Sequence, residues 1–346
     1  MRERREIVEL WRRGGAVALV TLVRVEGSSY RRVGARLLVG ADGRYAGSIS
    51  GGCLEAEVVR KAGWIVRGGA VMEKYSTLFD DTAEIPYGLG CGGTVDLLVE
   101  PAGTAEFGAL MEALEASLEG LESRVVTWLP ENGRAFRRAF GDVDAQGGFE
   151  ERVEAPHRLV VFGAGDDAQP MVQMAALLGW NVVVVDGRVQ WARAERFPEA
   201  RRVVVAQGFG DLEALGIGPR DAVVVMTHSY EQDRVWLAGA IRCGPRYLGL
   251  LGARHRSALL ASETAALLGW TVERTCEGLF APVGLDLGGD GAEAIALAVI
   301  SEIQACLEGK LREGKLGSSR RMSAEMVAAQ IAEGGASRYL QAQCAL

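Results

Sequence analysis

The sequence predicts an α/β protein in which an N-terminal mixed α+β domain precedes a Rossmann-like domain with a doubly wound parallel sheet. The first observation is length, since 346 residues suffice for two domains of the usual ~150 residues. The second is the alternation of apolar runs with helical stretches from residue 158 onward, which is typical of a parallel sheet covered on both faces. The third is a glycine-rich turn after the first of these runs, in RLVVFGAGDDAQP (158–170).

The start of the chain predicts a small β-rich layer. Residues 4–13 have the spacing of an amphipathic helix, and the apolar run that opens 16–30 predicts a buried strand leading into a Gly-Ser loop. Residues 31–50 alternate about Asp42-Gly43, a pair that favours a hairpin turn. The next expected elements are a helix at 53–66, strands at 70–76 and 94–99, a helix at 104–119 and a hairpin at 124–140.

The stretch 142–156 is polar and interrupted by glycine and proline, so we place the domain boundary there. We expect a first domain at 1–150, a Rossmann-like domain at 151–310 and a helical tail at 311–346, which is either an interaction element or a docked terminus. The expected strands of the second domain are RLVVFG, NVVVVD, RVVVA, DAVVVMTH and RYLGLLG, and a helix follows at 292–307.

Composition argues against several classes of protein. The 38 Lys and Arg against 45 Asp and Glu give a net charge of −7, whereas surfaces that bind nucleic acid or anionic membranes are cationic. The early apolar run AVALV (16–20) is too short for a signal peptide or a membrane span, so we predict a cytoplasmic protein. The 6 cysteines and 3 histidines are too scattered for a disulfide framework, a zinc knuckle or a His-rich metal site.

The glycine-rich turn has the pattern of a dinucleotide-binding site. Gly163, Gly165 and Ala168 occupy its three small positions, and Asp186 ends the next strand. In such turns the glycines admit a phosphate near the helix N-terminus, and the acid accepts hydrogen bonds from a ribose. The pattern predicts the fold more strongly than it predicts bound NAD or NADP, because Asp166-Asp167 would repel a pyrophosphate at the same place.

Other strand ends of the second domain should meet at the same edge of the sheet. They carry Arg188, His228 and Arg254, which together would suit an anionic ligand. In the alternative interpretation, His228 is an ordinary turn residue and the arginines are solvated or paired with Asp233 and Glu231.

Two cysteines lie in glycine-rich sequences of the first domain. Cys53 follows Gly51-Gly52 at the expected start of a helix, where the positive end of the helix dipole stabilises a thiolate. Cys91 lies between Gly90 and Gly92-Gly93, where consecutive backbone N–H groups could bind an anion.

Arg31 and Arg32 would add cationic donors to this domain. Together, the thiols and arginines could hold a phosphate-bearing cofactor and either contact a soft metal or carry sulfur. Alternatively, both cysteines are small apolar fillers and the glycines are ordinary turns.

Several segments, in order over about residues 14–308, resemble the XdhC/CoxI-type accessory factors of molybdenum hydroxylases such as xanthine dehydrogenase and carbon monoxide dehydrogenase. They are EGSSYRRVGARLLV (26–39), SGGCLE (50–55), GLGCGG (88–93), GAGDDAQP (163–170), VDGR (185–188), RFP (196–198), MTHSYEQD (226–233), YLGLLGARHR (247–256) and PVGLDLGG (282–289). The resemblance implies a characteristic N-terminal domain joined to a Rossmann-like domain, often in a homodimer. It also implies binding of the molybdenum cofactor (molybdopterin), sulfuration of that cofactor with a cysteine desulfurase, and its transfer to an apo molybdenum hydroxylase.

The same resemblance assigns site residues. Cys91 has the first claim to contact the cofactor, its molybdenum or its sulfur, and Cys53 has the second. The loops and the basic pair of this site are Gly51, Gly52, Gly90, Gly92, Gly93, Arg31 and Arg32. The sequence departs from the family at Asp166-Asp167, where many relatives have a Gly-His type continuation, and in the tail after the last matching segment.

Three functions remain open at this point. The leading hypothesis is a cofactor chaperone rather than a turnover enzyme, with both thiols facing a shared accessible hollow. The second is an NAD(P)-dependent oxidoreductase with its cofactor at Gly163, Gly165 and Asp186, and with His228 as proton donor. The third is a redox-regulated binding module in which Cys91 is readily oxidised without a cofactor.

Overall fold

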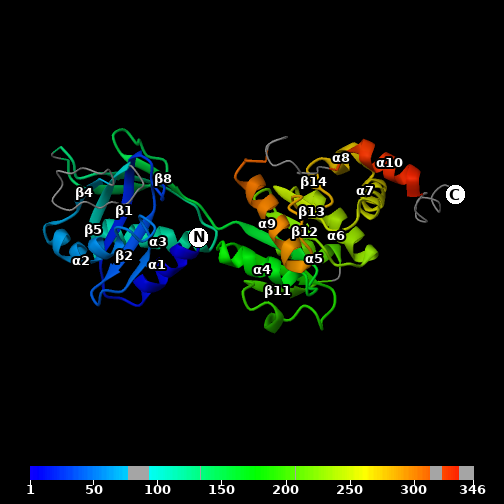
Figure 1. The fold of residues 1–346 in the computed structure, drawn as a ribbon, viewed down its shortest axis with the longest axis horizontal. Coiled ribbons are helices and arrows are strands. Elements are labelled where there is room, and N and C mark those ends of the chain that lie inside the picture. Colours follow the sequence, from blue (N-terminus) through cyan, green and yellow to red (C-terminus); the bar gives the residue numbers. More distant parts are fainter. Residues whose placement is uncertain (77–92, 133, 207, 312–321, 335–346) are drawn as a thin grey trace. The chain divides into compact units, whose positions relative to one another are not determined.

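The computed structural model describes residues 1–76, 93–132, 134–206, 208–311 and 322–334 (Figure 1). The chain divides into two compact units, Met1–Pro156 and His157–Leu346. The first has antiparallel sheets and the second has a parallel sheet, so the predicted fold class is confirmed. None of the helices in these ranges is long and apolar enough to cross a membrane.

The first unit contains most of the elements that the sequence predicts. Its helices are α1 (Arg2–Arg12), α2 (Glu55–Ile65), the short 3-10 helix η1 (Val66–Gly68) and α3 (Ala105–Leu118). Its strands are β1 (Ala16–Gly27), β2 (Arg36–Gly40), β3 (Tyr45–Gly47), β4 (Val71–Ser76), β5 (Gly93–Pro101), β6 (Ser123–Trp128), β7 (Arg137–Phe140) and β8 (Phe149–Val153).

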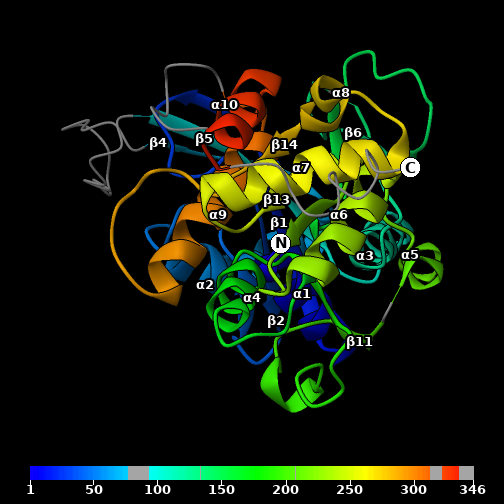
Figure 2. The same cartoon turned by 90° about the vertical axis from the view of Figure 1, so that its right-hand side faces the viewer.

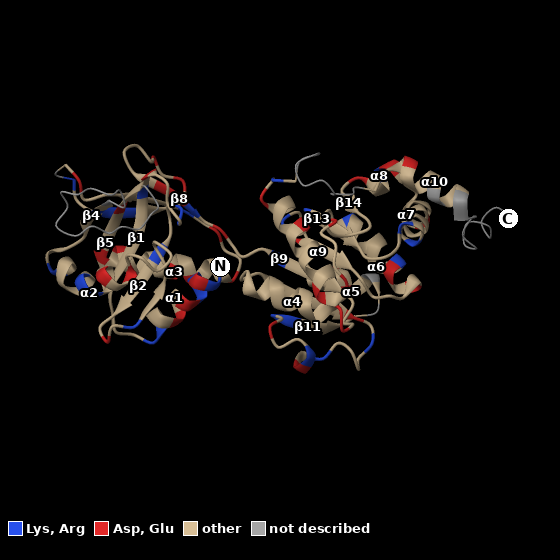
Figure 3. Ribbon diagram, in the orientation of Figure 1, with Lys and Arg blue, Asp and Glu red and all other residues tan. Residues whose placement is uncertain are grey.

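The main sheet of this unit has the order β3-β2-β1-β5-β4 and is antiparallel throughout. Alternate residues of β1 enter two hydrophobic clusters: Val20 packs in the cluster that contains α2, and Leu19 packs in the cluster that contains α1 and α3. Because both faces of the sheet are covered, β1 is a continuous apolar run and does not alternate with polar residues. Figure 3 shows that acidic and basic side chains both occur along α1.

A smaller sheet has the order β7-β6-β8. The predicted hairpin at 124–140 is confirmed by the antiparallel β6 and β7, and Asn132 in its connection has a φ of 52°. The interpretation of 142–156 as a polar connection is wrong for Phe149–Val153, because β8 pairs with β6 there. Only Val153 of this strand is buried, which is why its sequence resembles a connection.

The second unit alternates strands and helices. Its strands are β9 (Arg158–Phe162), β10 (Asn181–Asp186), β11 (Arg202–Val205), β12 (Ala222–Val225), β13 (Tyr247–Leu250) and β14 (Leu279–Phe280). Its helices are α4 (Ala168–Leu177), η2 (Ala194–Arg196), α5 (Phe209–Leu215), α6 (Tyr230–Cys243), α7 (Arg254–Leu268), α8 (Val272–Cys276), α9 (Ala292–Leu307) and α10 (Ala324–Gly334). The short elements β14, α5 and α8 were not predicted from the sequence.

The strands of the second unit form one parallel sheet in the order β11-β10-β9-β12-β13-β14. Numbered within the unit, this is the order 3-2-1-4-5-6 of the Rossmann fold. One hydrophobic cluster lies between the sheet and α4 with α9, and another lies between the sheet and α5, α6 and α7. The direction of the chain changes between β9 and β12, which is where ligands bind in folds of this kind.

The described part of the tail packs onto the second unit. Met322 and Val327 are buried in the cluster on the α7 side, and the Met322 N–H donates to the Leu279 carbonyl at 3.0 Å. Figure 2 shows α10 beside α7, and the two helices are in contact. Residues 322–334 are therefore a docked terminus, and a role of the tail as an interaction element stays a prediction.

Candidate functional site

Glu55 organises the turn that precedes α2. Its carboxylate accepts hydrogen bonds from the backbone N–H groups of Ile49, Ser50 and Gly52 at 3.0, 2.9 and 2.9 Å. The hydroxyl groups of Ser48, at 2.8 Å, and of Ser50 also donate to it. The side chain of Glu55 thus gathers the donors of residues 48–52 around one buried negative charge.

This hydrogen bonding keeps Glu55 ionised. Burial by itself would raise the pKa of the carboxyl group, but the hydrogen bonds, led by those from Ser50, lower the pKa to about 2. The Gly51 N–H is also engaged, because it donates to the Ser48 hydroxyl at 3.0 Å. The backbone donors of Gly51 and Gly52 are therefore used within the turn and are not directed at a ligand.

Cys53 lies between this turn and α2. Its thiol is free and exposed, whereas the next residue, Leu54, is buried in the cluster beneath α2 and fixes the end of the turn. Cys91, Gly90 and Gly92 lie outside the described residues. The expectation that the thiols of Cys53 and Cys91 face one hollow stays a prediction.

Three sequence motifs of the first unit meet beside this turn. The ring of Tyr30 lies against Gly51, where an added methyl group would be 2.5 Å from the Tyr30 Cδ1 atom. Gly51 also has a φ of 83°, which favours glycine. At the start of β5, a methyl group on Gly93 would overlap the carbonyl oxygen of Ser28. Gly51 and Gly93 therefore serve close packing against the loop that carries Tyr30.

The structure separates the predicted basic pair. Arg31 forms a two-point ion pair with Glu3 of α1, at 2.8 and 2.5 Å, so its charge is already neutralised. The prediction of Arg31 as a ligand contact does not fit this arrangement. Arg32 is exposed, and its side chain has no ion pair or hydrogen bond to any residue in the described ranges. Of the two arginines, Arg32 is therefore the better placed to meet an anionic ligand.

The glycine-rich turn of the second unit has the predicted backbone. Gly163 has a φ of 126°, and a methyl group there would lie 2.7 Å from the Met226 carbonyl carbon, so the turn packs directly on the end of β12. Gly165 approaches Asp167, whose Oδ1 atom would be 2.6 Å from an added methyl group. Ala168 is buried beneath α4. These three small residues fit the turn, and their contacts are with the protein itself.

Asp186 does not fit its predicted role at a ribose. It is fully buried, and its oxygens accept from the Ala164 N–H at 2.8 Å, from the Arg188 N–H at 2.8 Å and from the Arg188 guanidinium at 2.9 and 2.7 Å. A carboxylate has about four acceptor positions, so none remains for a ribose hydroxyl. Burial opposes ionisation, yet the Arg188 guanidinium and these N–H groups lower the pKa of Asp186.

The two acids of the turn are also paired. Asp167 Oδ2 lies 2.6 Å from His228 Nε2, and Asp166 Oδ1 accepts from Arg196 at 2.6 Å. Arg196 also donates to the Ala164 carbonyl at 2.5 Å and so braces the turn. His228 has a φ of 61°, an uncommon value for a residue other than glycine. The place of a pyrophosphate is thus lined with carboxylates that hold protein cations.

The predicted anionic site at the strand ends is only partly free. Arg188 is paired with Asp186 and His228 with Asp167, while Arg254 is exposed at the start of α7. Asp233 is buried and pairs with Arg256 at 2.6 Å, so the alternative interpretation correctly named this acid but not its partner. Within the described ranges, no three His, Cys, Asp or Glu residues come close enough to hold a metal ion.

Some organising residues were not assigned from the sequence. Glu55, Arg196 and Arg256 each tie down a loop, and none was a candidate. Glu55 could have been found, because an acid in the first turn of a helix after Ser-x-Ser and two glycines is placed to accept from the preceding N–H groups. The partners of Arg196 and Arg256 are 30 and 23 positions away, and no local pattern indicates them.

Two family models match the chain. A model described as the XdhC Rossmann domain matches residues 159–303, and a model described as the XdhC and CoxI family matches residues 10–76. The first match lies in the second unit and the second match lies in the first unit.

Individual proteins are similar over nearly the whole chain. A protein of Bacillus subtilis described as a probable xanthine dehydrogenase component is 29% identical over 311 residues, which cover 82% of this chain and 91% of that protein. The molybdenum cofactor insertion chaperone PaoD of Escherichia coli is 28% identical over 305 residues, covering 86% of this chain and 85% of the chaperone. A crystal structure described as a xanthine dehydrogenase from Bacillus halodurans has a TM-score of 0.76 and 26% identity, and covers 90% of this chain and 97% of its own.

Proposed function

Because the chain belongs to the XdhC and CoxI family, we propose that it binds the molybdenum cofactor and assists the maturation of a molybdenum hydroxylase. The similarity to a protein named as a molybdenum cofactor insertion chaperone supports this role, and it extends over both units. The cofactor is here a cargo that the protein holds and passes on.

One structural observation carries the assignment of the site to the first unit. The exposed Cys53 thiol and Arg32, which has no ion pair in the described ranges, lie in two segments that touch through Tyr30 and Gly51. A soft thiolate is a suitable ligand for a soft metal centre, and a guanidinium is a suitable donor to a phosphate. Cys91 follows the same chemistry and precedes Gly93, which packs on this loop, by two positions in the sequence.

These groups explain how a cargo can be held and then released. A thiolate and an arginine form contacts that a partner protein can replace one at a time, whereas a closed metal cage would have to unfold. We propose that Cys91 and Cys53 contact the metal end of the cofactor and that Arg32 contacts its phosphate. In this proposal a cysteine desulfurase supplies the sulfur for the sulfido ligand while the cofactor is held, and the protein acts as a homodimer.

The oxidoreductase interpretation lacks such an observation. The oxygens of Asp186 are filled by protein donors, and Asp166 and Asp167 place carboxylates where a pyrophosphate would lie. The Rossmann-like fold alone does not establish use of a dinucleotide.

The test is direct binding of the cargo. Molybdenum cofactor released from a denatured molybdenum enzyme is mixed anaerobically with the protein, and the retained molybdenum and pterin are quantified after gel filtration. We expect stoichiometric retention by the wild type and a large loss in the Cys53→Ser, Cys91→Ser double variant. Cys243→Ser, which changes a partly buried thiol of α6, is the matched control.

Failure of the wild type to retain the cofactor would remove the function itself. Undiminished retention by the double variant would remove only the assignment of the thiols. Titration of the same protein with NADH examines the alternative, since saturable enhancement of nicotinamide fluorescence would support the oxidoreductase.

A further inference from the structure

The loop of residues 28–35, which connects β1 to β2, is fixed at three places. At its start, Gly93 packs directly on Ser28. In its middle, Arg31 forms the two-point ion pair with Glu3. At its end, the Gly34 N–H donates to the Leu22 carbonyl at 2.8 Å. The backbone of this loop is therefore held in place before any ligand binds.

The anchored loop presents three neighbouring side chains to solvent. Tyr30 is 74% exposed, Val33 is 51% exposed and Arg32 is exposed without an ion pair in the described ranges. Single exposed apolar residues are common on protein surfaces, but here an aromatic ring, a cation and an aliphatic side chain occur within four positions. Residues 30–35 line an open hollow of about 470 Å³, a volume within the range of small-molecule sites.

The chemistry of these side chains matches a flat, phosphate-bearing heterocycle. An exposed tyrosine ring offers a surface for stacking, and an exposed guanidinium binds phosphate through charge-assisted hydrogen bonds. Because Tyr30 rests on Gly51, the stacking surface and the Cys53 turn are parts of one arrangement. A ligand bound by stacking would therefore lie beside an exposed thiol.

We propose that Tyr30 is the residue on which the pterin of the molybdenum cofactor stacks, with Val33 at the edge of the ring system and Arg32 at the phosphate. This inference rests on the proposed function and adds the groups that recognise the organic part of the cofactor. The anchors at Gly93, Glu3 and Leu22 lower the conformational entropy that binding would otherwise cost.

A protein partner is the competing occupant, because tyrosine and arginine are common at the centres of protein interfaces. The hollow along residues 30–35 and the contact between Tyr30 and the thiol-bearing turn favour the small molecule. The two occupants differ in the step that a Tyr30 variant would affect, which is either binding of the cofactor or its transfer to the hydroxylase.

The experiment measures the dissociation constant of the molybdenum cofactor for the full chain by pterin fluorescence. We expect Tyr30→Ala to weaken binding by about 5- to 100-fold, the range of aromatic stacking on a heterocyclic base, and Tyr30→Phe to restore it. Tyr45→Ala is the matched control, because Tyr45 of β3 is 52% exposed and lies outside the loop. Arg32→Gln should remove competition by inorganic phosphate, which we expect to weaken binding to the wild type.

The outcomes separate the inference from the function beneath it. If the wild type does not bind the cofactor, the proposed function fails. If the wild type binds and Tyr30→Ala binds equally well, only the assignment of Tyr30 is overturned. The assignment is also overturned if Tyr30→Ala keeps its affinity but no longer activates the hydroxylase, since Tyr30 would then contact the partner. Thermal unfolding of Tyr30→Ala should match the wild type, because the ring is largely exposed.

Discussion

The turn before α2 and the turn before α4 use glycine in similar ways but leave different groups free. Each places a positive-φ glycine against a neighbouring segment, at Gly51 beside Tyr30 and at Gly163 beside Met226. Each also directs backbone N–H groups to a carboxylate of the protein, Glu55 in the first unit and Asp186 in the second. In both turns the protein thus supplies its own anion.

The difference lies in what surrounds these carboxylates. Beside Glu55, a thiol, an aromatic ring and an arginine are exposed. Beside Asp186, the acids of the turn are paired with His228 and Arg196. A glycine pattern therefore predicts the path of the backbone, whereas the availability of the surrounding polar groups decides which turn can take a ligand. The experiments below alter this comparison in decreasing order of expected effect.

Gly163→Ala should have the largest effect, because the obstacle in the second unit is backbone. The new methyl group would overlap the Met226 carbonyl group, and alanine rarely adopts a φ of 126°. We expect the free energy of unfolding of the second unit to fall by about 3 kcal/mol or more. Hydrogen exchange followed by mass spectrometry on peptides of each unit measures this loss separately from the first unit.

Gly269→Ala is the control, since Gly269 has a φ of 64° and no atom would lie within 4 Å of its methyl group. Its cost should be about 1 kcal/mol. Equal losses in Gly163→Ala and Gly269→Ala would mean that the approach to Met226 is unimportant.

Glu55→Gln should have an intermediate effect confined to the first unit. The glutamine amide would direct a donor at N–H and hydroxyl groups that now donate to the carboxylate, at a cost of about 1–3 kcal/mol. Cofactor retention should fall with it, because the turn carries Cys53. The control is Glu293→Gln, which changes an acid in the first turn of α9. Wild-type stability in Glu55→Gln would show that the donors find other acceptors.

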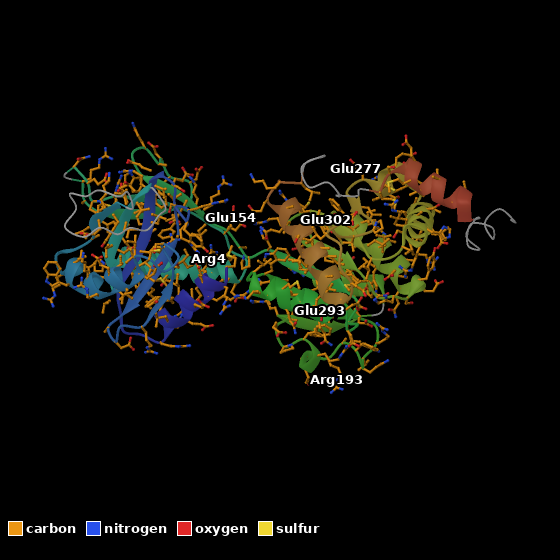
Figure 4. The ribbon with its side chains drawn as sticks, viewed as in Figure 1. Arg4, Glu154, Arg193, Glu277, Glu293 and Glu302 are labelled. Atoms are coloured by element: carbon orange, nitrogen blue, oxygen red, sulfur yellow. The ribbon has the colours of Figure 1, made fainter. Side chains whose placement is uncertain are left out.

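The smallest expected effect is a difference in pH dependence between the two units. Glu302 of α9, labelled in Figure 4, is fully buried, and its Oε2 atom accepts from the Tyr247 hydroxyl at 2.6 Å and the Gly284 N–H at 2.9 Å. Burial raises the pKa of Glu302 in spite of these two hydrogen bonds. The pKa of Glu55, in contrast, is lowered to about 2.

The signs of the two contributions are opposite. The folded second unit holds the Glu302 proton more tightly than the unfolded chain, so this contribution to stability is lost as pH rises from about 4.5 through the raised pKa. The contribution of Glu55 is present above about 4.5 and is lost as pH falls toward 2. Denaturant unfolding of Glu302→Gln between pH 5 and pH 9 should therefore show a flatter stability profile for the second unit. An unchanged slope would exclude Glu302 as its source.

The fold follows from the sequence wherever apolar spacing is strong. The continuous run of β1 and the alternation from β9 to β13 are local signals of buried strands, and both are confirmed. β8 and β14 were missed for physical reasons, since β8 buries only Val153 and β14 has only two residues. Their positions depend on pairing with β6 and β13, which sequence spacing does not show.

The site could be predicted as a set of segments but not as a set of free groups. The glycine-framed Cys53 and the two adjacent arginines were visible, yet the partner of Arg31 lies 28 positions away in α1. Asp186 stands where a ribose-binding acid would, and only its contacts show that Arg188 and Ala164 fill it. Ion pairing between distant residues decides availability, and neither residue type nor local spacing encodes it.

The docking of α10 onto α7 has a practical consequence for anyone preparing this protein. The matched family region ends at residue 303, which invites a shorter version that stops soon afterwards. Such a version would lack Met322 and Val327 and would expose to water the apolar surface that they cover. Shortened preparations should therefore aggregate more readily, and affinity tags are better placed after the final residue than in place of the last helix.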